Sequence, residues 1–356
     1  MGLTKIPESM LGFEISEGGG SEPNILMPIA GNNASALQAY FDDLRNTKKS
    51  GKLGPGSFGV TNASGPACVL DLSTLTQEAV SEHRRPNIFG DGIGTTVING
   101  GSSGQYAMKI NGGSGIAAHH YLTIADLAFS GFQGLHVFDS AYLRLRDIAF
   151  QGQSIGMYLE SVLSSSFRDL DFRSCGVGLS VAKGGGFSGI NANSFRDCRF
   201  AFNTGLGLQG QSFSTQLNFN ACTFEGNGTQ GNGSTGGAVI TVNGTEGRVG
   251  ANFNGCYFEN NAGGFDVQLV NAGSAYVTHT FVGCNFQRVL SSNYVTNNIQ
   301  TFGLNRIVFI GCSFNAYGTY VPSAARPYVG FDGNQIIECY NCHFGSATEQ
   351  GILVNK

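Results

Sequence analysis

Short apolar runs built on one Phe-centred pattern recur along most of this 356-residue chain. Nine segments share the pattern, from YLTIADLAF to ECYNCHF. Each segment contains one anchor, and the anchors are Phe129, Phe150, Phe172, Phe200, Phe224, Phe258, Phe286, Phe314 and Phe344. A fixed motif separated by insertions of varying length is typical of a solenoid, whose coils stack while their loops differ. The pattern therefore predicts an all-β fold, a single-stranded right-handed parallel β-helix (solenoid).

The columns of this motif predict a bend in every coil. The residues five and two positions before each Phe are apolar, ending in Cys339 and Cys342. Strand alternation would place these two positions on opposite faces, so both face inward only if the chain bends between them. The position three before each Phe holds Asp126, Asp147, Asp169, Asp197, Ala221, Gly255, Gly283, Gly311 and Asn341. Asp, Asn and Gly best tolerate a left-handed backbone, which identifies this position as the bend.

A second family of strands, which includes GLHVFD, GMYLE, GLSVAK and GLGLQG, lies between the Phe segments. Their alternation places one set of side chains inside. This set contains Leu135, Val137, Met157, Leu159, Leu179, Val181, Leu206 and Leu208. The intervening residues should form an outward lateral face, on which His136, Tyr158 and Ser180 share one column.

The first hundred residues follow a different pattern. Leu37, Tyr40, Phe41 and Leu44 have the spacing of a short amphipathic helix. Such a helix would cap the open end of the solenoid, which otherwise exposes unpaired strand edges. Three regions are expected: an N-terminal attachment or linker segment at 1–32, a capping helix with the first coils at 33–104, and the parallel β-helix at 105–356.

Composition and charge narrow the classes of function. Gly accounts for 54 of the 356 residues, which suits many tight bends between short strands. The net charge is −4 and no basic run is present, so a nucleic-acid partner is not expected. No apolar stretch approaches the roughly 20 residues of a membrane span, so membrane insertion is not expected either. The N-terminus lacks the apolar segment of a signal peptide, which indicates synthesis in a cytoplasm.

The opening of the chain resembles that of a known superfamily. The run from ASALQAYF through LGPGSFGV to IFGDGIGTTVING is similar to the capping helix, first strand and Gly-rich turn of pectate-lyase-like right-handed β-helix proteins. The leading LTKIPESML resembles the short N-terminal segment of bacteriophage tailspikes and capsule depolymerases. Two features depart from that pattern: Asn32-Asn33 replaces the usual Asp-Asp, and no C-terminal trimerisation or carbohydrate-binding domain is expected after the last coil.

This resemblance implies a function and a setting for the chain. Tailspikes of this class are homotrimers that bind lipopolysaccharide or capsule, often with endoglycosidase or lyase activity. By that likeness, the protein is a virion tail component made in the host cytoplasm that binds, and cleaves, a bacterial surface polysaccharide. Its N-terminal segment would attach to other virion tail proteins, and no cofactor or metal is expected. Two alternatives stay open: a non-enzymatic receptor-binding or structural virion spike, and a bacterial polysaccharide lyase or hydrolase of the same fold.

Two conspicuous rows of side chains have structural explanations. The position two before the Phe holds Cys in six coils, at Cys198, Cys222, Cys256, Cys284, Cys312 and Cys342. Leu and Ile occupy the same column in earlier coils, which favours core packing over a disulfide or metal role. The four Asp of the bend column resemble an acid–base row, but the bend alone accounts for them, and Arg146, Arg168 and Arg196 offset their charge.

Carboxylates outside the bend are better candidates for catalysis. Glu225 and Glu259 directly follow their Phe, and Asp171 precedes its Phe on the same face, with Arg173 and Arg199 nearby. Acids one coil apart fall near the roughly 5–5.5 Å separation of retaining glycosidases, and acids two coils apart near the roughly 6.5–9.5 Å of inverting ones. We therefore predict the three acids as catalytic and the two arginines as substrate-binding. Ordinary solvated strand residues are the alternative.

The lateral face offers a second candidate site, with His136, Tyr158 and Glu160 predicted to bind substrate. Tyr, His and a cationic group such as Lys183 are the parts that a polysaccharide lyase uses to abstract a proton and stabilise the resulting anion. Tyr158 and Phe138 can also stack on sugar rings. Unrelated surface residues would give the same pattern in a single sequence.

Overall fold

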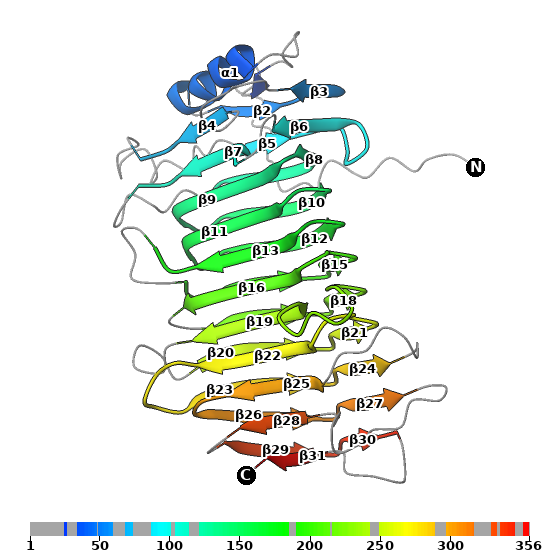
Figure 1. Cartoon of the computed structure of the whole chain (residues 1–356). Coiled ribbons are helices and arrows are strands. Elements are labelled where there is room, and N and C mark those ends of the chain that lie inside the picture. The colour runs from blue at the N-terminus through cyan, green and yellow to red at the C-terminus, as the bar shows by residue number, and fades with distance from the viewer. Residues whose placement is uncertain are drawn as a thin grey trace, which may run out of the picture.

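The computed structural model describes 14 segments of the chain. They are residues 25–26, 34–47, 49–59, 68–73, 87–100, 104–113, 121–184, 190–213, 216–242, 249–288, 297–316, 329–332, 335–345 and 352–355. Within these residues, short strands stack in one column below the helix α1 (Ala34–Thr47), as Figure 1 shows. All paired strands of the described part run parallel, so each coil adds one layer to a solenoid. The fold is the right-handed parallel β-helix with a short N-terminal helix that the sequence predicts.

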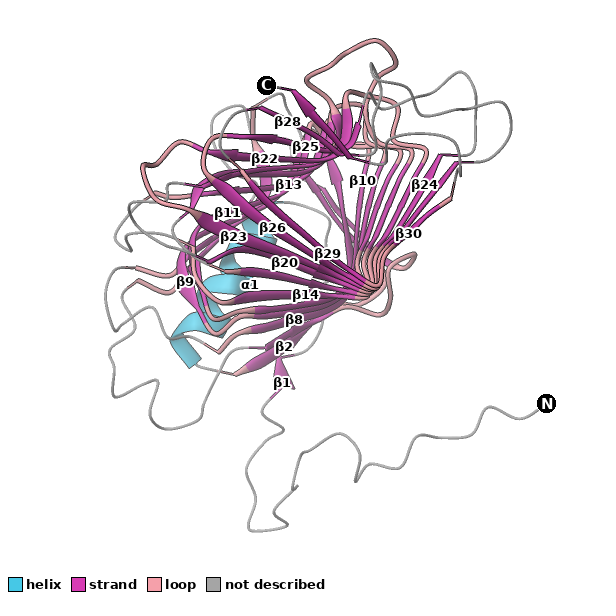
Figure 2. Cartoon of the chain, turned by 90° about the horizontal axis from the view of Figure 1, so that it is seen from below, coloured by secondary structure: helices cyan, strands magenta, loops and turns pink. Residues whose placement is uncertain are grey.

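The strands form two long sheets, and the end-on view in Figure 2 shows how they enclose a narrow interior. We call the 11-stranded sheet the lateral sheet. It contains β4 (Cys68–Asp71), β7 (Tyr106–Asn111), β9 (Gln133–Ala141), β11 (Ile155–Leu163), β13 (Val177–Ala182), β16 (Leu206–Phe213), β19 (Gly236–Val242), β22 (Phe265–Asn271), β25 (Asn297–Phe302), β28 (Val329–Asp332) and β31 (Ile352–Asn355).

The 20-stranded sheet is folded along the bend into two arms. Three strands run through the bend: β8 (Thr123–Gly131), β10 (Arg144–Gln151) and β12 (Ser166–Arg173). The first arm adds β1 (Ile25–Leu26), β2 (Ser50–Lys52), β5 (Asn87–Phe89), β14 (Asn193–Arg196), β17 (Leu217–Asn220), β20 (Val249–Asn254), β23 (Val277–Val282), β26 (Asn305–Ile310) and β29 (Ile336–Tyr340). The second arm adds β3 (Gly56–Gly59), β6 (Thr96–Gly100), β15 (Arg199–Ala201), β18 (Thr223–Glu225), β21 (Tyr257–Glu259), β24 (Asn285–Arg288), β27 (Ser313–Ala316) and β30 (His343–Phe344).

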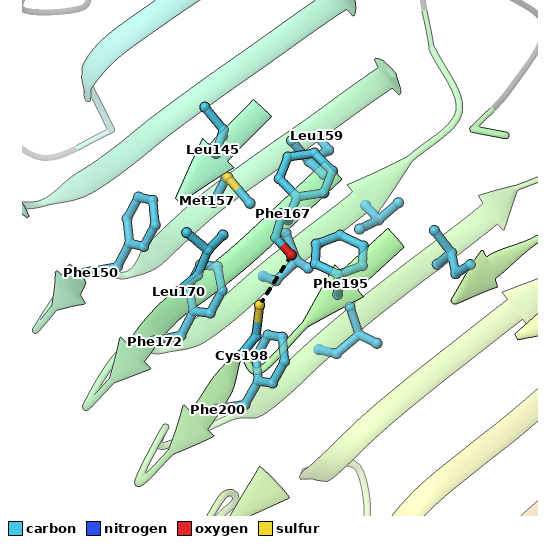
Figure 3. Close-up of a cluster of buried hydrophobic side chains, with 14 of the residues drawn as sticks. Leu145, Phe150, Met157, Leu159, Phe167, Leu170, Phe172, Phe195, Cys198 and Phe200 are labelled. Atoms are coloured by element: carbon cyan, nitrogen blue, oxygen red, sulfur yellow. Dashed lines mark hydrogen bonds between the residues drawn. The ribbon is translucent and has the colours of Figure 1, made fainter. Parts of the chain in front are cut away.

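The Phe anchors lie directly above one another inside the solenoid. Neighbouring anchor rings stack with centroids 4.6 to 5.2 Å apart from Phe129 to Phe344. A second stack runs from Phe167 to Phe309 at similar spacing, and Figure 3 shows the two stacks side by side. Because the strands are parallel and in register, each ring buries its faces against the coils above and below. Burial of these large rings contributes apolar area that holds neighbouring coils together.

The predicted bend is confirmed in every coil. All nine residues three before a Phe have φ between 51° and 61°, including Asp126 and Asn341. The Asp side chains point outward and pair with the neighbouring arginines, for example Arg146 with Asp147 at 2.6 Å and Arg168 with Asp169 at 2.9 Å. The row of acids is therefore explained by backbone geometry and charge pairing.

The Cys column is buried from Cys198 to Cys312, as the sequence predicts. These thiols pack in the core and lie close to backbone carbonyls, as Cys198 Sγ does to Phe167 O at 3.7 Å in Figure 3. The expectation of an inward, covered position was wrong for Cys339, which is exposed, and only partly right for Cys342, which is half-buried. Both belong to the last coil of the two-armed sheet, where no further described strand covers the core.

A ladder of buried amides, which the sequence analysis did not identify, lines the corner between the second arm and the lateral sheet. Asn203, Asn227 and Asn261 each stand three residues after a Phe anchor and are fully or almost fully buried. Asn227 Nδ2 donates to the oxygens of Phe200 at 2.9 Å and of Asn261 at 2.9 Å. Asn227 Oδ1 accepts from the backbone N–H and the amide of Asn203. The ladder satisfies backbone groups that the tight corner leaves without strand partners.

The capping helix is also confirmed, because Leu37, Phe41 and Leu44 are buried against the first coils. The side chain of Gln38 donates to Val69 O at 2.9 Å and accepts from Val69 N–H at 2.7 Å. It thus takes the place of a neighbouring strand at the edge strand β4. The attachment segment expected at 1–32 lies outside the described residues except for β1, as do Asn32-Asn33.

Candidate functional site

Three predicted residues, His136, Tyr158 and Glu160, lie together on the outward face of the lateral sheet. His136 on β9 and Tyr158 on β11 are register neighbours, and their rings stack with centroids 4.8 Å apart. His136 Nε2 lies 3.1 Å from Glu160 Oε2. Ser180 continues the column in register, as expected, but its side chain is buried, so it does not contribute to the surface.

Two further residues of this site, Tyr106 and Lys109 on β7, were missed by the sequence analysis. Lys109 pairs in register with His136, and its Nζ lies 5.2 Å from the centroid of the Phe138 ring. The Tyr106 ring lies 4.9 Å from that of His136, which is thus flanked by two tyrosines. The signal was present, because YAMKI repeats the alternation of QGLHV, with which it pairs in register, but β7 precedes the first Phe anchor and could not be aligned from it. We call Tyr106, Lys109, His136, Phe138, Tyr158 and Glu160 the His136 cluster.

The environment shifts the pKa of four groups in the His136 cluster. Burial, reinforced by the Lys109 ammonium, lowers the pKa of His136 to about 4. Burial, with the nearby Tyr158 and Glu160, raises the pKa of Tyr106 to about 12. Burial and neighbouring negative charge also raise the pKa of Tyr158 and of Glu160.

Near neutral pH the imidazole of this cluster is therefore uncharged and both phenols are protonated. Because the Glu160 carboxylate only accepts hydrogen bonds, His136 donates Nε2–H to it and keeps Nδ1 as a base. Groups with perturbed pKa values gather at functional sites more often than elsewhere. The His136 cluster therefore places a proton acceptor (Nδ1 of His136), two proton donors (the phenols of Tyr106 and Tyr158) and one cation (Lys109) on a single surface.

The carboxylates predicted as catalytic lie on the second arm of the other sheet. Glu225 and Glu259 are register neighbours on β18 and β21, as the sequence predicts. Glu225 is paired with Arg199 at 2.9 Å, and Asp171 with Arg173 at 3.2 Å. Glu259 accepts a hydrogen bond from the hydroxyl of Tyr257 at 2.8 Å.

The predicted site residues thus separate into two surfaces. His136, Tyr158 and Glu160 are on the lateral sheet, whereas the three acids and two arginines are on the second arm. Among the described residues, no group of three or more His, Cys, Asp and Glu side chains is arranged to hold a metal ion. No helix in the described part is both long and apolar enough to cross a membrane.

The fold and these surfaces define a right-handed β-helix protein, and comparisons with known proteins agree. The family model described as "Right handed beta helix region" matches residues 93–246. No curated protein matches the chain in sequence. The ORF18 protein of Geobacillus virus E2 has a similar structure, with 15% identity and a TM-score of 0.62 over 87% of this chain and 58% of that one.

Two other solved structures are similar across most of the chain. An alginate lyase from Paenibacillus sp. FPU-7 has 14% identity and a TM-score of 0.52, over 90% of this chain and 99% of that one. Tailspike protein 2 of the Escherichia coli O157:H7 bacteriophage CAB120 has 11% identity and a TM-score of 0.51, over 83% of this chain and 43% of that one. The chain spans less than two thirds of the length of both viral proteins. At this identity the similarities confirm the fold.

Proposed function

We propose that this protein binds a bacterial surface polysaccharide on its lateral sheet and cleaves it at the His136 cluster. The observation that carries the proposal is the geometry of the cluster, in which an imidazole, two phenols, a carboxylate and an ammonium group lie together on an aromatic surface. The name of one similar structure, an alginate lyase, supports a role directed at glycans, and that of another, a phage tailspike protein, supports a place in a virion tail.

The chemistry that best fits these groups is β-elimination on a sugar that carries a carboxylate. Lys109 would neutralise the sugar carboxylate, and the free Nδ1 of His136 would take the proton from the adjacent carbon. The electron pair of that C–H bond forms a C=C bond while the glycosidic C–O bond breaks. Tyr158 would protonate the leaving oxygen, and Glu160 would stabilise the imidazolium that forms.

The catalytic role predicted for Glu225, Glu259 and Asp171 stays a prediction. Their support is that Glu225 and Glu259 stand one coil apart in register, a spacing near that of retaining glycosidases. Hydrolysis there would give a new reducing end without an unsaturated sugar. The two proposals therefore differ in their product.

One assay distinguishes these outcomes. The whole chain is incubated with capsular polysaccharide, lipopolysaccharide and alginate, while reducing ends and the absorbance of an unsaturated uronide are followed. We expect the unsaturated product, its loss in His136→Gln, and its retention in Glu225→Gln and Glu259→Gln. Reducing ends alone, lost in the two glutamate variants, would assign the chemistry to the second arm. Binding without any product would overturn cleavage and favour a receptor-binding spike.

We also propose, from the resemblance of the sequence, that the protein is a homotrimer in the virion tail and attaches to other tail proteins through residues 1–32. Sedimentation of the purified chain should give the mass of three copies. A single-chain mass in dilute solution would contradict the trimer.

A further inference from the structure

Phe202 is an exposed aromatic residue at a turn position where the other coils have small or turn-forming residues. Two positions after the Phe anchors the chain turns through a left-handed conformation in six successive coils. The residues there are Gly131, Gly152, Ser174, Phe202, Gly226 and Asn260. Five of them are small or are turn formers, whereas Phe202 is a bulky aromatic residue with φ 55°. Bulky side chains held in such a disfavoured conformation cluster at functional sites.

The Phe202 ring is both exposed and held in place. The residue is 50% exposed, whereas the neighbouring anchor Phe200 is fully buried. The guanidinium carbon of Arg199 lies 5.9 Å from the ring centroid. The ring also lies against Gly226 of the next coil, where an added Cβ would come within 2.7 Å of it. A glycine one coil away thus leaves the space that the ring fills, and the ring presents a fixed flat surface.

Charge beside this ring identifies the kind of sugar it suits. Arg199 is paired with Glu225 and Arg173 with Asp171, and Glu259 follows Glu225 in the same column. Both guanidinium groups are therefore already paired with a carboxylate, and a third carboxylate, that of Glu259, lies in the column of Glu225. An acidic sugar would find no unpaired cation among these residues, whereas the hydroxyls of a neutral sugar can donate to the carboxylates and accept from the guanidinium groups.

We propose that Phe202, with Arg199 and Glu225, forms a stacking site for an uncharged pyranose ring of the polysaccharide. This inference rests on the proposed function and adds a second contact away from the His136 cluster. Phe202 stands just before β16, which lies two strands beyond β11 in the lateral sheet. That offset is about 10 Å along the stack. Phe202 also lies at the corner after β15, seven residues before Gln209, which shares the column of Tyr158. A glycan that contacts both surfaces must therefore cross this corner as well as pass along the stack.

The test compares Phe202→Asn with Phe202→Tyr and, as a matched control, Phe132→Asn. Phe132 is 39% exposed but does not have a left-handed backbone. The probes are neutral glucan, galactan and mannan hexasaccharides, titrated into the whole chain by calorimetry. We expect at least one neutral probe to bind and Phe202→Asn to bind it about tenfold more weakly. Phe202→Tyr and Phe132→Asn should bind as the unaltered chain does.

Thermal stability provides a second readout, because Asn tolerates the left-handed conformation better than Phe. Phe202→Asn should therefore raise the Tm, by about 2 °C, while it weakens binding. A lower Tm would show that the ring is structural and overturn the proposal, as would unchanged binding or no binding of any neutral probe. Loss of the unsaturated product in His136→Gln, with Phe202→Asn binding normally, would leave the proposed function intact and remove this inference alone. Weakened binding by Phe202→Asn, with no product from any glycan, would support the stacking site and overturn the proposed cleavage.

Discussion

At the scale of single residues, backbone conformation selects the side chain at the bend of every coil. Ala221 is the one member of this column that is neither Gly, Asp nor Asn, and it has φ 51°. An L-residue with a Cβ carries steric strain in this region, although the greater freedom of Gly in the unfolded chain offsets part of it.

We therefore expect Ala221→Gly to stabilise the protein by about 0.5–1 kcal/mol. The matched control is Ala149→Gly, because Ala149 lies in the middle of β10 outside the left-handed region. That change should cost about 0.5–1 kcal/mol. Denaturant unfolding of both variants checks the pair, and destabilisation by Ala221→Gly would contradict the strain argument.

The sequence predicted the bend because nine coils repeat it, so that each column could be compared many times. The amides of Asn203, Asn227 and Asn261 appear in only three coils, and their role depends on hydrogen bonds across the corner that no spacing reveals. The His136 cluster was found in part, since its members on β9 and β11 belong to aligned coils. Tyr106 and Lys109 belong to a coil without a Phe anchor, and Phe202 is revealed only by its φ angle.

A buried histidine in the first arm makes stability depend on pH. His279 on β23 is fully buried, and its Nδ1 accepts the backbone N–H of Ala251 at 3.1 Å. Burial lowers the pKa of His279 to about 4, against 6.5 for an ordinary histidine. The unfolded chain thus binds a proton below pH 6.5 that the folded chain does not bind until about pH 4. The stabilising preference for neutral His279 is present above pH 6.5 and is lost progressively between pH 6.5 and 4.

Between pH 6.5 and pH 4, protonation of His279 in the unfolded chain should lower the free energy of unfolding by about 3 kcal/mol. His279→Gln removes the titration, so its stability should fall less steeply than that of the unaltered chain over this interval. Denaturant unfolding of both proteins at half-unit pH steps measures the difference in their free energies of unfolding. The contributions of all other titrating groups cancel in this difference, because both proteins contain them. Parallel pH profiles for the two proteins would refute the assignment.

At the scale of elements, the amide ladder holds the corner that connects the second arm to the lateral sheet. Asn227→Ala would leave the buried N–H of Asn203 and the buried carbonyl of Phe200 without their partners. Each unsatisfied group costs about 1–3 kcal/mol, so the variant, with two such groups, should lose about 2–6 kcal/mol of stability. Asn254→Ala is the control, because Asn254 is exposed and its one side-chain hydrogen bond is long, at 3.5 Å. It should change stability by no more than about 0.5 kcal/mol, and equal losses in both variants would argue against the ladder.

At the scale of the whole molecule, the solenoid has two unlike ends. The first coils are covered by α1, whereas in the last coil Cys339 and Tyr340 are exposed and Ile337 is only half-buried. Each coil is stabilised chiefly by its neighbours, so opening should begin at β29 and β30, beyond which no described strand covers the core.

Amide hydrogen exchange should follow this gradient. We expect the backbone amides of central strands such as β12 and β18 to exchange most slowly. Those of β29 and β30 should exchange faster than the amides of any other strand. Mass spectrometry of peptides after timed exchange measures the order. Protection of β29 and β30 equal to that of the central strands would show that this end is covered, for example by a second copy of the chain.

The equivalence of successive coils also has a consequence for how such a molecule changes size. Phe281 and Phe309 occupy the same place in consecutive layers, and Val282 pairs in register with Ile310. Removing residues 282–309 would therefore join Phe281 to Ile310 and bring β22 against β28. The Phe258 ring would then stack on the Phe314 ring, and the Phe281 ring would keep its stack on Phe253. Gene duplication or deletion can lengthen or shorten the shaft by one layer without redesigning an interior. The distance between its two ends is thus a trait that evolution can adjust in steps, separately from the surfaces that the shaft carries.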